Sequence, residues 1–99
     1  MENNTCLFYE GISDVYEKLL QFCMTNGFKV KISNDKFYLI EAKKISWLFW
    51  KNMRMELEIL AVEKTRVRVS SKIYRFIRRQ PKLENKYIKK IENYFDLPA

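Results

Sequence analysis

The side chains best suited to acid–base chemistry are two carboxylates, Glu56 and Glu58, which stand two positions apart. On a β-strand this spacing places both side chains on one face, where paired carboxylates can divide acid and base roles. Arg66 and Arg68 follow with the same spacing. We expect the two arginines to lie across the sheet from the two glutamates, and this arrangement favours a surface ion-pair lattice over catalysis.

The other common catalytic and metal-binding patterns are missing from the sequence. The chain has no histidine, which removes the commonest general base and the usual zinc ligands. Its two glycines, at positions 11 and 27, are too far apart to form a phosphate-binding loop. Cys6 and Cys23 are widely separated, and Cys23 falls in a helical pattern that predicts a small buried side chain. We therefore expect a non-enzymatic protein with no metal site and no cofactor.

Positive charge is concentrated in the last third of the chain. Residues 1–63 hold eight Lys or Arg and nine Asp or Glu, whereas residues 64–99 hold eleven Lys or Arg and three Asp or Glu. A surface with this asymmetry attracts nucleic acid, anionic lipid or an acidic protein, and the alternative is a merely solvated basic surface. The candidate anion-binding side chains are Arg66, Arg68, Lys72, Arg75, Arg78, Arg79, Lys82, Lys86, Lys89 and Lys90.

Residues 75–79 interleave arginines with two apolar side chains, Phe76 and Ile77. Arginines that contact phosphates beside an aromatic ring that stacks on bases would suit a nucleic acid. In the alternative interpretation, Phe76 and Ile77 pin a loop to the core while the arginines face solvent.

A second candidate surface comes from residues 45–51, which include both tryptophans of the chain. Neighbouring residues of a strand point to opposite faces, so only two of the four residues at 47–50 can face the core. A two-residue turn at 51–52 would give the core pairs Trp50–Met53 and Leu48–Met55.

This turn leaves Trp47 and Phe49 on the face of the sheet opposite to the core. An exposed apolar patch there would indicate a protein partner, with a homodimer as the simplest version, or a small apolar ligand. The alternative is that the last helix or the stems of arginines cover the two rings.

The periodicity of apolar residues predicts the elements that position these side chains. Residues 12–26 repeat apolar side chains every three or four positions, which predicts a helix with its N-cap at Ser13 and its end at Asn26-Gly27. A second helix is predicted over residues 84–95, after Pro81. Alternating apolar residues predict strands at 7–11, 28–32, 37–43, 45–51, 53–61 and 67–73, with 45–51 either separate or a continuation of the strand before it.

The order β-α-β-β-β-β-α predicts an α+β fold in which an antiparallel meander sheet has both helices packed on one face. We expect a single domain over residues 1–99, because this length is typical of one domain. The first residues lack the pattern of a signal peptide, and no apolar run exceeds four residues, against about 20 for a membrane span. These features predict a cytoplasmic protein without a transmembrane segment.

The element order resembles one repeat of the TATA-binding-protein-like fold, a minimal helix-grip arrangement. The segments T-R-V-R-V-S-S at 65–71 and E-N-K-Y-I-K-K-I at 84–91 also resemble the end of small bacterial domains of this shape. The resemblance covers nearly the whole chain at the level of topology, and it implies no shared activity. Because TATA-binding protein forms its saddle from two repeats, a chain with one repeat would need a dimer to imitate it.

Overall fold

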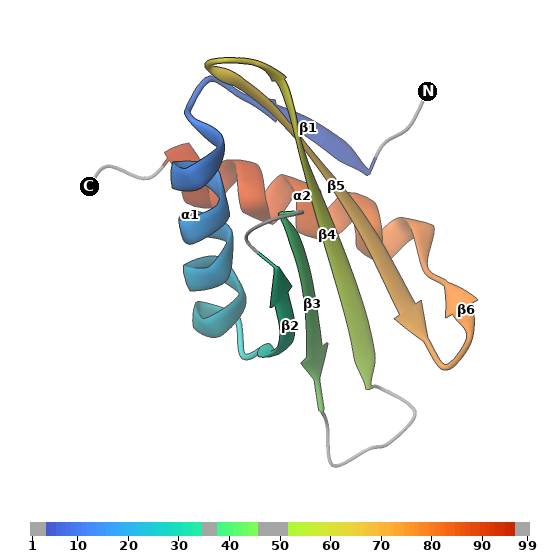
Figure 1. Cartoon of the computed structure of the whole chain (residues 1–99). Helices are drawn as coiled ribbons and strands as arrows, with labels where there is room; N and C mark the ends of the chain where they lie inside the picture. Colours follow the sequence, from blue (N-terminus) through green and yellow to red (C-terminus); the bar gives the residue numbers. More distant parts are fainter. Residues whose placement is uncertain (1–3, 35–37, 46–51, 97–99) are drawn as a thin grey trace.

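The computed structural model describes residues 4–34, 38–45 and 52–96, which form one antiparallel sheet and two helices (Figure 1). The predicted α+β class, with both helices on one face of an antiparallel sheet, is confirmed. The sequence does not predict the short strand β6, because two residues carry no periodicity. In chain order the elements are β1 (Thr5–Phe8), α1 (Ile12–Thr25), β2 (Lys29–Asn34), β3 (Leu39–Lys44), β4 (Met53–Glu63), β5 (Arg66–Arg75), β6 (Arg78–Arg79) and α2 (Pro81–Asp96).

Strands β2 to β5 form a meander, and β1 completes the sheet beside β5 in the order β1-β5-β4-β3-β2. Strand β5 is longer than its neighbour β1, which pairs only with residues 67–70. The short strand β6 pairs with Tyr74 and Arg75 on the same side of β5. One edge of β5 is therefore shared between β1 and β6, with a gap between them.

One face of the sheet, called here the inner face, is buried beneath the helices (Figure 1). The alternation along β4 explains this, because Met53, Met55, Leu57 and Ile59 are buried between more exposed residues. Strand β5 alternates in the same way. The opposite side, called here the outer face, carries the intervening polar residues. The helical side chains buried on the inner face are Val15, Tyr16, Leu19, Phe22, Cys23, Tyr87, Ile88 and Ile91.

Aromatic pairs join the C-terminal helix to the first half of the chain. The Phe8 and Phe95 rings stack with centroids 4.0 Å apart. Two edge-to-face pairs, with centroids 5.6 and 5.5 Å apart, are Phe22–Tyr94 and Phe28–Tyr87. Such pairs add about 0.5–1.5 kcal/mol each beyond the area they bury, so they fix the position of α2 over the inner face.

The predicted helix N-cap at Ser13 is wrong, because Gly11 occupies that position. The carbonyl oxygen of Gly11 accepts the first helical hydrogen bond from the N–H of Val15 at 3.1 Å. Ser13 lies inside the first turn, where the backbone is already helical. The predicted end of the helix is confirmed, since Asn26 is the C-cap and Gly27 has a φ of 79°, a conformation that favours glycine.

The predicted pairs Trp50–Met53 and Leu48–Met55 are also wrong. Met53 lies opposite Lys44 and Met55 lies opposite Ala42, so β3 pairs with β4 six residues earlier than the predicted turn requires. The error arose because turn residues without glycine gave a weak indication of where the hairpin closes. Leu48, Trp50 and most of the predicted strand at 45–51 lie outside the residues that the structure describes.

The two glutamates do not face the two arginines. Glu56 lies opposite Lys72, and Glu58 lies opposite Ser70. The β4–β5 turn explains the difference, because it places Glu63 opposite Arg66 at the tip of the hairpin. From that tip the register places Arg68 opposite Leu60, so Glu58 and Glu56 face residues farther along β5 than the two arginines. The predicted ion-pair lattice is therefore wrong in its register.

Candidate anion-binding site

The ten predicted anion-binding residues are divided among three parts of the molecule. Arg66, Arg68 and Lys72 are on β5 at positions that alternate with buried residues, so they belong to the outer face. Arg75, Arg78 and Arg79 belong to the hairpin of β5 and β6. The four helical lysines are exposed on α2, which covers the other face of the sheet: Lys82, Lys86, Lys89 and Lys90. The structure therefore does not bring the ten side chains into one patch.

The sheet register instead aligns basic residues from both halves of the chain. Arg79 on β6 is opposite Tyr74 on β5, and Tyr74 is opposite Arg54 on β4. Arg54 is opposite Lys43 on β3, and Lys43 is opposite Lys29 on β2. Adjacent strands are about 4.8 Å apart, so these five residues cross the sheet as neighbours. We call them the cationic row.

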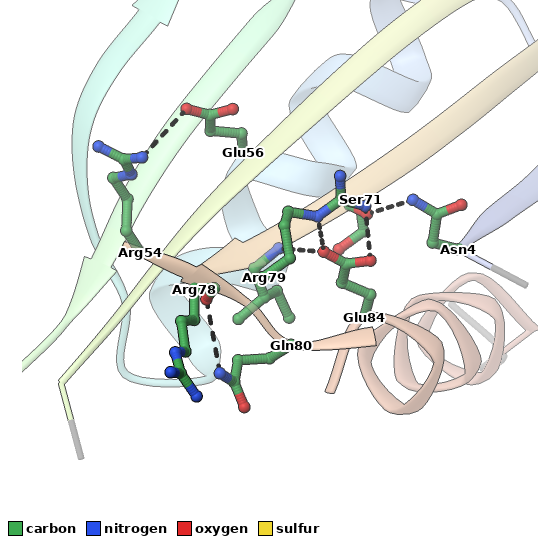
Figure 2. Close-up of polar contacts among 9 residues, drawn as sticks. Asn4, Arg54, Glu56, Ser71, Arg78, Arg79, Gln80 and Glu84 are labelled. Carbon is green, nitrogen blue, oxygen red and sulfur yellow. Dashed lines mark hydrogen bonds and ion pairs between the residues drawn. The ribbon is translucent and has the colours of Figure 1, made fainter. Parts of the chain in front are cut away.

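Tyr74 lies between two guanidinium groups of this row. The guanidinium carbon of Arg54 is 4.7 Å from the centroid of the Tyr74 ring, and that of Arg79 is 6.0 Å from it. Contacts of this kind hold arginine side chains over an aromatic face while leaving their outer N–H groups for a partner. Arg54 also lies 3.9 Å from Glu56, which is a loose ion pair (Figure 2).

A pocket of about 280 Å³ lies at this end of the sheet, between the β3–β4 strand ends and the β5–β6 hairpin. Its lining combines cationic side chains with two aromatic rings, which suits a small planar anion or part of a larger one. We call it the tip pocket; among the described residues it is lined by Lys43, Lys44, Ile45, Asn52, Met53, Arg54, Tyr74 and Phe76.

The β5–β6 hairpin presents two apolar side chains at its tip. Phe76 is 70% exposed and Ile77 is 93% exposed. The alternative in which these residues pin a loop to the core is therefore wrong. The reason is geometric, since the two residues form the two-residue turn between the paired strands β5 and β6, where both stay largely exposed.

A buried carboxylate anchors this hairpin to α2 (Figure 2). Both carboxylate oxygens of Glu84 accept hydrogen bonds from Arg79, at 2.6 Å from Nε and 2.9 Å from Nη2. The backbone N–H of Ile73 donates a third hydrogen bond to Glu84 at 2.9 Å. Ile73 lies in the gap between β1 and β6, and its carbonyl oxygen accepts a hydrogen bond from the Gln80 N–H. The Glu84 carboxylate therefore accepts the hydrogen bond from the Ile73 N–H of β5 that a backbone carbonyl of a neighbouring strand would otherwise accept.

The charge of Glu84 is stabilised by its partners. Burial alone would raise the pKa of its carboxyl group, but hydrogen bonds from Arg79 and Ile73 and the positive charges of Arg79 and Lys72 lower that pKa below its usual value. Glu84 thus remains ionised at neutral pH although its side chain is only 3% exposed. Because Arg79 is committed to this ion pair, its predicted role as a phosphate contact is restricted to the N–H groups that Glu84 leaves unused.

Both cysteines of the chain lie in the described ranges, away from the protein surface. Cys6 and Cys23 are buried free thiols, and burial raises the pKa of each to about 12, with Glu92 adding to the effect at Cys6. Within the described ranges no three His, Cys, Asp or Glu side chains gather in a way that could hold a metal ion. Neither of the two described helices is long and apolar enough to cross a membrane.

Two predicted partner-binding residues, Trp47 and Phe49, lie outside the described residues, so their role stays a prediction. Lys29, Lys43 and Arg54 are not among the residues that the sequence predicts as anion-binding. They belong to the part of the chain whose net charge is slightly negative, and only the strand register brings them together. Glu84 is likewise absent from the predicted site residues, although it is the only acidic residue between Lys64 and Lys90, a pattern that indicates a specific partner.

Comparison with known proteins assigns no family to the chain. No family model matches it, and no curated protein matches it. The resemblance to the TATA-binding-protein-like fold stays a prediction.

Proposed function

We propose that this protein is a non-enzymatic binding module that holds an anionic partner across the cationic row and the tip pocket. The observation that carries the proposal is the direct cross-strand alignment of Lys29, Lys43 and Arg54. Like charges that face each other across a sheet repel and reduce the stability of the fold. A bound anion would relieve this repulsion, so binding and folding would reinforce each other.

The scarcity of ion pairs along the cationic row supports this row as the anion-binding surface. Among the described residues, Lys29 and Lys43 take part in no ion pair, whereas Arg54 has only the loose contact with Glu56. Lysines that are exposed and unpaired can neutralise phosphates or carboxylates of a partner without first breaking an internal contact. The proposal therefore moves the predicted anion-binding surface from the C-terminal third alone to a row drawn from both halves of the chain.

A salt series with a polyanion tests the proposal. The double variant Lys29→Gln/Lys43→Gln removes two charges from the row. Its matched control, Lys86→Gln/Lys89→Gln, removes two charges from the exposed side of α2 and has the same net charge. We expect the row variant to bind an abasic deoxyribose-phosphate oligomer more weakly, and the slope of log K against log salt to fall by about 1.4. Equal losses in both variants would mean that only net charge attracts the polyanion, and would refute the proposal.

A second candidate function is binding of a protein partner, a second copy of the chain included, at another part of the outer face. Leu7 and Leu60 flank Arg68 across three strands, and the two leucines are 44% and 47% exposed. Apolar side chains gathered on an open sheet face support such an interface. Light scattering on the wild type and on Leu60→Lys tests it: a dimer that dissociates in the variant would support the candidate, and a monomer at all concentrations would rule out self-association.

A further inference from the structure

The conformation of Phe76 is unfavourable for the residue type that occupies it. Its φ is 57°, in the left-handed region that a side chain with a Cβ atom rarely adopts. Two-residue turns between paired strands normally place Asn, Asp or Gly at such positions. A phenylalanine is therefore an uncommon choice at this position of the turn.

Tyr38 provides the comparison within the same molecule, because its φ of 51° is also left-handed. Its ring packs edge-to-face against Tyr16 with centroids 5.6 Å apart, and it lies against the hydrophobic core. Burial of an aromatic ring therefore accompanies the unfavourable backbone at Tyr38. Phe76 has the same backbone conformation but keeps 70% of its surface exposed, so burial offsets much less of the cost.

The position of Phe76 points to a partner that the ring would meet. Phe76 lines the tip pocket together with Tyr74, and the same pocket is bordered by Lys43, Lys44 and Arg54. Exposed aromatic rings beside a track of cations are the combination that binds single-stranded nucleic acids, because bases stack on the rings while the cations contact the phosphates. Base pairs in a duplex already stack on each other and leave no free face for the ring.

We infer that the anionic partner is a single-stranded nucleic acid, with one unpaired base stacked on Phe76 in the tip pocket and its backbone along the cationic row. The inference rests on the proposed function, since it names the partner of the same surface. It assigns the strained turn a role: the hairpin holds the ring at the mouth of the pocket at some expense of stability.

The neighbouring residue, Ile77, distinguishes this partner from an anionic membrane. Ile77 is even more exposed than Phe76 and stands at the same tip, but it does not line the tip pocket. A hairpin that inserted into a lipid surface would use both apolar side chains. A base that stacks on an aromatic ring would use Phe76 and not Ile77.

Binding to oligothymidylate and to an abasic oligomer of equal length tests the inference, because the two probes differ in bases and not in phosphates. We expect the wild type to bind oligothymidylate about 5-fold to 150-fold more tightly than the abasic oligomer. Phe76→Asn should abolish this difference while its thermal midpoint stays unchanged or rises, since asparagine tolerates the left-handed turn. Phe76→Trp should retain the preference, and Ile77→Ser should bind both probes as the wild type does.

The possible results separate the two proposals. Equal, salt-dependent binding of both probes by the wild type would overturn the stacked base and leave the proposed function standing. Failure of both probes to bind at low salt would overturn the proposed function together with the inference. Tighter binding of duplex DNA than of oligothymidylate would overturn the inference. The inference would also be overturned if the protein bound phosphatidylglycerol vesicles and if Phe76→Asn and Ile77→Ser weakened this binding equally.

Discussion

The ion pair between Glu84 and Arg79 predicts an asymmetric response to mutation. The Glu84 side chain is 3% exposed, whereas the Arg79 side chain is 44% exposed. Removing either residue breaks the same two hydrogen bonds, but the residue left behind differs. Arg79→Met would leave a buried carboxylate with only the Ile73 N–H among the three hydrogen-bond donors it has now. Glu84→Gln would leave a guanidinium group that water can reach.

The magnitudes follow from this difference in exposure. An uncompensated buried charge costs about 3–5 kcal/mol, so Arg79→Met should destabilise the protein by that amount. Glu84→Gln keeps an oxygen for the Ile73 N–H, and the half-exposed Arg79 can be hydrated, so we expect a loss of about 1–2 kcal/mol. In a domain of this size, about 1 kcal/mol changes the melting temperature by roughly 4–8 °C. The two variants should therefore melt at clearly different temperatures.

Urea denaturation of both single variants and of the double variant Arg79→Met/Glu84→Gln measures the effect as a double-mutant cycle. We expect the double variant to be less destabilised than the two single losses combined, with a coupling of about 1–3 kcal/mol, because it buries no unpaired charge. The m-value should stay constant, which shows that the surface exposed on unfolding has not changed. A loss for Arg79→Met no larger than for Glu84→Gln, or losses that simply add, would refute the reasoning.

Three further predictions concern buried groups. The pKa of Glu84 in the folded protein is below the usual 4.5, so Glu84 should contribute stability above that pH and lose this contribution as the pH falls through the lowered value. When the melting temperature is measured against decreasing pH, it should decline less steeply for Glu84→Gln than for the wild type. Cys6 and Cys23, with pKa values raised to about 12, should react with a disulfide reagent at pH 8 only as fast as the protein opens, so rapid labelling in native buffer would contradict their burial. The Ser71 hydroxyl is buried without a hydrogen-bond partner among the described residues, and Ser71→Ala should therefore leave the free energy of unfolding unchanged or raise it by up to about 1 kcal/mol, as urea denaturation would show.

Local patterns predicted most of the architecture. Alternation along Met53 to Ile59 identified the buried side of β4, and the three- to four-residue repeat of Val15, Leu19 and Phe22 identified the helix that covers it. These predictions succeeded because burial of one face imposes a period on the chain. The predicted N-cap, Ser13, lies two residues after the observed N-cap, Gly11. Serine is the better side-chain cap, but the hydrogen bond from the Val15 N–H to the Gly11 carbonyl oxygen already begins the helix at Gly11.

The candidate site depended on register, which periodicity does not determine. A strand keeps the same alternation whichever residue of its neighbour it faces, so the sequence could not show that Lys29, Lys43 and Arg54 form one row. The charge count by segment even favoured another surface. The hydrogen bonds of Glu84 could not be predicted from the sequence for a related reason. Its partners, Arg79 and the Ile73 N–H, are brought to it only when β6 folds back along β5.

The covering of one backbone edge of β5 bears on whether the protein aggregates at high concentration. A long strand with a free edge is a template for pairing with another molecule, and such edges cause aggregation. Here β1, the carboxylate of Glu84 and β6 occupy successive stretches of that edge. At the other end of the sheet, β2 carries Lys29 and Lys31, charges that discourage edge-to-edge pairing. Loss of the Glu84 contact would therefore leave the Ile73 N–H on that edge without its acceptor and open this stretch of β5 to pairing with another molecule.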